Sequence, residues 1–112
     1  MRFIPGQTRL YGPNTFSGSV LSMVGFDLGD KGYDPNFSMA IISIEQIELV
    51  DADVIFATTL ADGTDRASFE SLWSNLSAVQ AGQQFDIADD VWMTGIGVLG
   101  AHRILDDLET WL

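Results

Sequence analysis

The fold of this chain is decided by residues 43–59, which read SIEQIELVDADVIFATT. Ser43, followed three positions later by Gln46, matches a capping box, so we expect a short helix to begin here. The run VIFAT at residues 54–58 is apolar without alternation and rich in β-branched residues, which indicates a strand buried on both faces. A capped helix that leads directly into such a strand is typical of an α/β protein.

Further elements are expected on both sides of this stretch. Strands are predicted near residues 2–4, 53–58 and 84–88, and a long C-terminal helix is predicted near residues 94–111. Residues 37–42 predict a short edge strand, and residues 7–13 are expected to form a loop. The predicted fold is a three-layer α/β sandwich with a short, mostly parallel central sheet, which is a Rossmann-like lobe formed by residues 1–112 as a single domain.

The composition narrows the class of protein. An apolar content of 46% over 112 residues favours one packed domain over a disordered chain. Sixteen acidic residues against five basic ones give a net charge of −11, which would repel nucleic acids and anionic membrane surfaces. The absence of cysteine excludes thiol catalysis, disulfides and thiolate metal sites. No nucleic-acid partner is therefore expected.

The N-terminal sequence shows no targeting segment. Residues 1–6, MRFIPG, are not followed by the apolar segment of a signal peptide, and no apolar run approaches the roughly 20 residues of a membrane span. Met1 instead opens a predicted strand. We therefore expect the chain to be a fragment of a longer protein.

Cationic and aromatic residues gather in the segments that follow the predicted strands. In a parallel sheet these connections meet at the carboxyl edge, where α/β proteins bind ligands. Residues 5–13, 59–65 and 89–93 form these connections, and in or next to them lie Arg9, Tyr11, Arg66 and Trp92. This arrangement favours an anionic or aromatic ligand, although ordinary loop residues are an equal alternative.

A glycine pattern at residues 95–100, GIGVLG, matches the dinucleotide-binding fingerprint. Its context departs from that motif, because the chain ends before a second strand could supply the acidic residue that holds the ribose. Asp89 and Asp90 would also repel a pyrophosphate. Close packing of the last helix on the sheet is favoured, and a small nucleotide-binding enzyme domain using Gly95–Gly100 is the alternative.

The remaining polar residues do not indicate catalysis or a metal site. His102 has no Ser or Cys arranged as a nucleophile, and the spacing of Asp27, Asp30 and Asp34 does not follow the EF-hand pattern. Glu45 lies at the second position of the capped helix, where the helix dipole favours its charge. The same position would present a carboxylate to an arginine on a partner protein.

Four stretches together resemble a known family. Residues 42–47 and 52–56, ISIEQI and ADVIF, look like the second-lobe signature of substrate-binding proteins of the iron–siderophore and vitamin B12 class. Similar in order and spacing are RLYGP at residues 9–13, LWSNLSAVQAG at residues 72–82, and Trp92 with Gly95 and the closing ILDDL. The resemblance covers nearly the whole chain.

The resemblance implies the C-terminal lobe of a bilobed, class III periplasmic binding protein. Such a protein would bind a ferric siderophore in a cleft completed by a missing N-terminal lobe and deliver it to an ABC permease. Arg9, Tyr11 and Trp92 best match the ligand-facing positions, and Glu45 matches the residue that docks on the permease. Arg66 is a weaker candidate that the family resemblance does not include. The chelator would hold the iron, so neither a cofactor nor protein metal ligands are implied.

The leading hypothesis is therefore a non-enzymatic, extracytoplasmic solute-binding module for an ABC importer, lipid-anchored in its parent protein. The nucleotide-using enzyme domain is the runner-up, and a free-standing α/β interaction domain is the third hypothesis.

Overall fold

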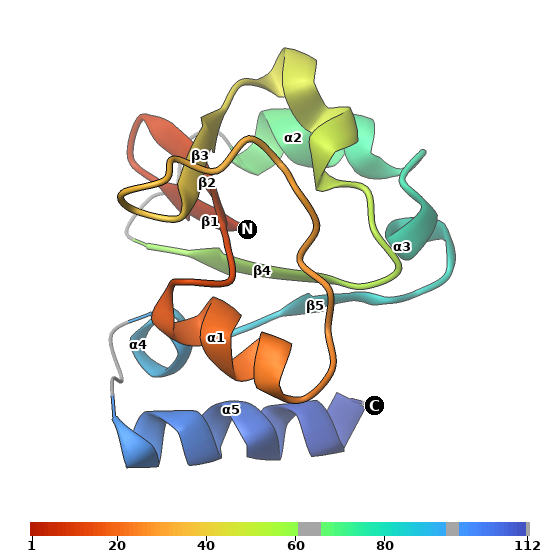
Figure 1. The fold of residues 1–112 in the computed structure, drawn as a ribbon. Coiled ribbons are helices and arrows are strands. Elements are labelled where there is room, and N and C mark those ends of the chain that lie inside the picture. Colours follow the sequence, from red (N-terminus) through yellow and green to blue (C-terminus); the bar gives the residue numbers. More distant parts are fainter. Residues whose placement is uncertain (61–65, 94–96, 112) are drawn as a thin grey trace.

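The computed structural model describes residues 1–60, 66–93 and 97–111 of the chain, which form three layers around a mixed sheet (Figure 1). The sheet has the strand order β3-β2-β1-β4-β5. Its strands are β1 (Arg2–Ile4), β2 (Gln7–Tyr11), β3 (Met39–Ile42), β4 (Ile55–Thr59) and β5 (Gln84–Asp86). Strand β1 pairs in parallel with β4, and β4 with β5, whereas β2 is antiparallel to both β1 and β3. The predicted strands and the predicted edge strand are confirmed.

Helices cover both faces of the sheet. On one face lie η1 (Ile44–Val50), which is a 3-10 helix, α2 (Arg66–Trp73) and α3 (Ser77–Gln80). On the other face lie α1 (Phe16–Met23), α4 (Asp89–Trp92) and α5 (Val98–Trp111) (Figure 1). The long C-terminal helix is confirmed from Val98 onward, while residues 94–96 are outside the described part of the chain. None of the described helices combines the length and the apolar character that crossing a membrane requires.

The deciding stretch behaves as its sequence predicts. The Ser43 backbone N–H donates to Gln46 Oε1 at 3.0 Å, so the capping interaction starts η1. Strand β4 is covered on both sides: Ile55 and Ala57 belong to the core under α2, and Phe56 packs against the core under α1 and α5. The covering helices explain why this strand lacks polar alternation.

The prediction of a loop at residues 7–13 is wrong for its first five residues, which form β2. Thr8 and Leu10 are buried, while Gln7, Arg9 and Tyr11 alternate with them and are only partly buried. Pro5 and Gly6 make the two-residue turn of the β1–β2 hairpin. Proline fixes a negative φ at the first position, and Gly6 supplies the positive φ of +75° that a type II turn needs at the second. The predicted parallel pairing is therefore found for β1, β4 and β5, whereas β2 and β3 add two antiparallel strands to the sheet.

Candidate functional site

The pairing of β1 with its two neighbours brings several polar side chains onto one face of the sheet. Arg2 is directly opposite Thr58 in the parallel pair with β4 and opposite Arg9 in the antiparallel pair with β2. Side chains at paired positions point to the same face. Because Thr58 is next to the last residue of β4, this group lies near the carboxyl edge predicted to bind a ligand.

Arg2 forms a double hydrogen-bonded ion pair with Asp89, the first residue of α4. Arg2 Nε lies 2.8 Å from Asp89 Oδ1, and Nη2 lies 3.0 Å from Oδ2. Thr58 Oγ1 donates to the same carboxylate at 3.3 Å. The two charged side chains are only 14% and 11% exposed, so solvent screens them little. The hydrogen bond to Asp89 raises the pKa of Arg2 above its ordinary value, which keeps the guanidinium charged.

Tyr11 connects this ion pair to Arg9. Its phenol oxygen accepts from Arg2 Nη1 at 3.2 Å and from Arg9 Nη1 at 3.4 Å. Arg9 Nε donates to Gln7 Oε1 at 2.9 Å. Among the residues that the structure describes, Arg9 has no acidic partner within ion-pair distance, whereas Arg2 has Asp89. We call this group the arginine cluster, defined as Arg2, Arg9, Tyr11, Thr58 and Asp89.

Trp92 lies three residues after Asp89 in α4, but its side chain is part of the core. It is 1% exposed, and its indole N–H donates to Asp107 Oδ2 at 2.8 Å. Its ring centroid is 5.1 Å from that of Phe56 and 6.4 Å from that of Trp111. Trp92 is therefore close to Asp89 of the arginine cluster in the sequence, but neither face of its ring is exposed.

Arg66 lies on the opposite face, and its guanidinium group has several partners. It contacts Glu70 at 2.6 Å, pairs with Asp86, and donates to Thr59 Oγ1 at 2.8 Å. Its Cζ atom lies 5.3 Å from the ring centre of Phe3, so the group is also held by a cation–π contact. The structure does not bring Arg66 together with Arg9.

Glu45 is exposed in the first turn of η1, as its helix position predicted. Helix η1 covers the sheet face opposite α4 (Figure 1). Glu45 is therefore separated from the arginine cluster by the sheet, and a partner bound at Glu45 would not cover that cluster.

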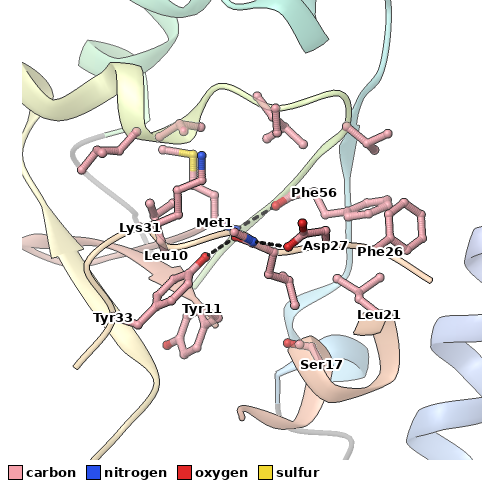
Figure 2. A pocket seen from close by; sticks show the side chains of 18 of the residues that line it. Met1, Leu10, Tyr11, Ser17, Leu21, Phe26, Asp27, Lys31, Tyr33 and Phe56 are labelled. Carbon is pink, nitrogen blue, oxygen red and sulfur yellow. Dashed lines mark hydrogen bonds between the residues drawn. The ribbon is translucent and has the colours of Figure 1, made fainter. Parts of the chain in front are cut away.

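A cavity of about 420 Å³ lies between α1, residues 26–33 and residues 49–56. Figure 2 shows Tyr11 and Tyr33 on one side of it and Phe26 and Leu21 on the other. Tyr33 donates its hydroxyl to the Leu28 carbonyl at 2.9 Å, and the Met1 amine donates to the Phe56 carbonyl at 2.9 Å. Tyr11 and Trp92 are also lining residues, so the cavity adjoins the arginine cluster.

The described residues offer neither a metal site nor a complete glycine pattern as a second candidate site. Within residues 1–60, 66–93 and 97–111, no group of three or more His, Cys, Asp or Glu side chains is placed to hold a metal ion. Gly95 and Ile96 of the glycine pattern lie outside the described residues. In its described part, Gly97 has a φ of +106° and immediately precedes α5.

The sequence-based reasoning missed Arg2, Thr58 and Asp89. Asp89 was considered only as part of an adjacent acidic pair, although its partner is Arg2, 87 residues away in the sequence. The alternation of Arg2, Phe3 and Ile4 was a weak signal that Arg2 faces away from the Phe3 core. The partner becomes apparent only in the structure, where Arg2 is paired with Thr58 of β4 and α4 begins beside it with Asp89.

The comparisons with known proteins agree with this fold and with the sequence resemblance. No protein-family model matches the chain. A probable siderophore-binding lipoprotein, YfiY of Bacillus subtilis, is 34% identical over 99% of the chain and 38% of its own length. An achromobactin-binding periplasmic protein of Dickeya dadantii is also 34% identical, over 89% of the chain and 35% of its own length.

A solved structure gives the same result in three dimensions. Staphylococcus aureus SirA superposes with a TM-score of 0.81 and 28% identity, over 99% of this chain and 46% of that chain. The chain is related to siderophore-binding proteins. It spans about a third of the length of the curated relatives and less than half of the solved chain.

Proposed function

We propose that this chain is the C-terminal lobe of a bilobed solute-binding protein, and that it binds a ferric siderophore for an ABC importer without catalysis. The observation that carries the proposal is the placement of Arg9. In a chain with a net charge of −11, this guanidinium lies partly exposed near the carboxyl edge and is hydrogen-bonded to neutral partners. Relatives of the chain carry names of siderophore-binding proteins.

The proposed contacts follow from the geometry of the arginine cluster. Arg9 supplies the positive charge for an anionic chelate, and Tyr11 lies beside it as both a ring and a hydroxyl group. The chelator holds the iron, so the site needs no metal ligands from the protein. Contact of Trp92 with the ligand stays a prediction, although its side chain forms a cavity wall rather than an exposed ring. For Arg66, which was the weaker candidate, we propose a structural role instead, because two acids already engage its guanidinium group.

Titration of the chain with ferric chelates tests the proposal against the enzyme alternative. Tryptophan fluorescence is followed while ferric citrate, a ferric hydroxamate, NAD or ATP is added. Saturable quenching by a ferric chelate with no response to NAD or ATP is the expected result, because Trp92 lies just behind the arginine cluster. Saturable binding of a nucleotide with no response to either chelate would favour the nucleotide-binding enzyme instead.

The proposed extracytoplasmic role also requires a partner in the membrane. In the full-length protein, which we propose to be lipid-anchored, Glu45 is proposed to dock on the permease because it is exposed on a capped helix away from the ligand site. Glu45→Arg should leave chelate binding unchanged and abolish uptake. Glu109→Arg is the matched control, since Glu109 is also exposed but lies on α5, on the other face of the sheet. Normal uptake by the Glu45 variant would remove the docking role.

A further inference from the structure

The hydroxyl group of Tyr11 has an unusual set of neighbours. A phenol oxygen can accept hydrogen bonds and carries one hydrogen to donate. Both acceptor positions face guanidinium groups, Arg2 at 3.2 Å and Arg9 at 3.4 Å. Among the described residues, no acceptor lies within hydrogen-bond distance of the Tyr11 hydrogen. Because both guanidinium groups donate to the phenol oxygen, the Tyr11 hydroxyl keeps its own hydrogen for an acceptor other than these two side chains.

The position of Arg2 is fixed by Asp89. The carboxylate takes Nε and Nη2 of Arg2 in a two-point contact, which leaves Nη1 directed at Tyr11. Thr58 holds the same carboxylate from β4. This pairing also cancels the charge of Arg2, so an incoming anion would meet Arg9 as the cation that lacks an acidic partner within the described part of the chain.

We propose that the Arg2–Asp89 pair positions Tyr11 as a hydrogen-bond donor to a carboxylate group of the chelate that is held at Arg9. The proposal rests on the proposed function and names the ligand class of that site. A carboxylate accepts one N–H from Arg9 and one O–H from Tyr11, both of which are charge-assisted bonds. A neutral hydroxamate chelate would gain less from the same pair. Arg2 and Asp89 are positioning residues that do not touch the ligand.

The first experiment measures the loss of the Tyr11 hydroxyl. Dissociation constants of ferric citrate and of the neutral hydroxamate chelate ferrichrome are measured in the full-length protein, with this chain unchanged and with Tyr11→Phe. The variant should weaken citrate binding on the order of tenfold and change ferrichrome binding much less, since one hydrogen bond to a charged group is lost. Tyr33→Phe is the matched control, because it removes the other tyrosine hydroxyl, which donates to the Leu28 carbonyl.

The second experiment asks whether Asp89 acts through Tyr11. Asp89→Asn is made alone and together with Tyr11→Phe, and the ferric citrate affinities form a double-mutant cycle. Removal of the negative charge of Asp89 affects binding of the anionic chelate whether residue 11 is Tyr or Phe. An effect that acts through the position of the Tyr11 hydroxyl is present only with Tyr. We expect the effect of Asp89→Asn to differ at least about threefold between the backgrounds. Asp86→Asn, in the pair with Arg66, should show equal effects in both.

The results distinguish a failure of the positioning role from a failure of the proposed function. If ferric citrate binds but Tyr11→Phe loses nothing, or the cycle shows no coupling, the positioning role is wrong and the proposed function stands. If neither ferric chelate binds the full-length protein that contains both lobes, the proposed function is wrong and this proposal fails with it. Should Asp89→Asn not fold, Arg2→Lys replaces it in the cycle. It keeps the charge but cannot make the two-point contact and also reach Tyr11.

Discussion

Two arginines at the same edge of the sheet have opposite surroundings. Arg66, on the α2 face, is held by Glu70, Asp86 and Thr59 and lies over two aromatic rings. Arg9, on the α4 face, is hydrogen-bonded to Gln7 and Tyr11, and its described neighbours include no paired acid. Position at the carboxyl edge is therefore not sufficient to indicate a ligand contact. The partners of each guanidinium distinguish a structural cation from a cation that can bind an anion.

The largest expected difference between the two faces is in stability. Asp89→Ala leaves Arg2 charged and mostly buried without its partner, which should lower the free energy of unfolding by about 3 kcal/mol. Asp86→Ala removes an acid that is 66% exposed on the other face and should cost less than about 1 kcal/mol. Urea unfolding of the two variants measures both values. Equal losses in the free energy of unfolding would mean that the Arg2–Asp89 pair stabilises the fold no more than the more exposed Arg66–Asp86 pair does.

The next difference is in ligand binding. Arg9→Ala should weaken binding of an anionic ferric chelate about tenfold, because one charge-assisted contact is lost. Arg66→Ala should leave binding nearly unchanged, since its guanidinium is already engaged by two acids. Isothermal titration with ferric citrate compares the two variants. A greater loss for Arg66→Ala than for Arg9→Ala would reverse the assignment of the two arginines.

The smallest expected effect concerns the Met1 amine beside the cavity, a group that is free only in the isolated chain and not in a longer protein. Burial lowers its pKa to about 5 from 8.0, so in the folded chain the amine is neutral at pH 7. The unfolded chain binds this proton below pH 8, so stability falls as the pH drops from 8 to 5 and this group adds no further change below pH 5.

Because a terminal residue can detach locally, we expect the change to be on the order of 1 kcal/mol. Urea unfolding midpoints between pH 5 and 8, with and without N-terminal acetylation, measure it. An acetylated chain with the same pH dependence would show that the amine is not responsible.

The sequence was sufficient to predict features that depend on local pattern. The capping pair Ser43 and Gln46, the strand at residues 55–59 and the α/β class follow from residues close together in the chain. The alternation in QTRLY at residues 7–11 is equally local, but the polar Gln7 and Arg9 and the preceding Pro5 made it look like a loop. Its strand character depends on the β1–β2 turn, which pairs Arg9 with Arg2.

The candidate site was only partly predictable because its contacts join distant segments. Arg9 and Tyr11 were found from their place after the first strand, but the Arg2–Asp89 pair depends on the register of β1 against β4 and on the start of α4. Trp92 was expected in the connection at residues 89–93, where its ring would contact a ligand. Instead, α4 turns it into the core, where its indole N–H is satisfied by Asp107 of α5.

The most direct test is to locate a bound ferric chelate on the chain. Paramagnetic Fe³⁺ broadens the NMR signals of nuclei close to it, so backbone amide and arginine Nε–H signals are recorded while ferric citrate is added. We predict that the signals of Arg9 and Tyr11 broaden first, while those of Arg66 and Glu70 remain sharp. Selective broadening around Arg66, or around Lys31 and Tyr33 in the cavity, with Arg9 unaffected, would contradict it.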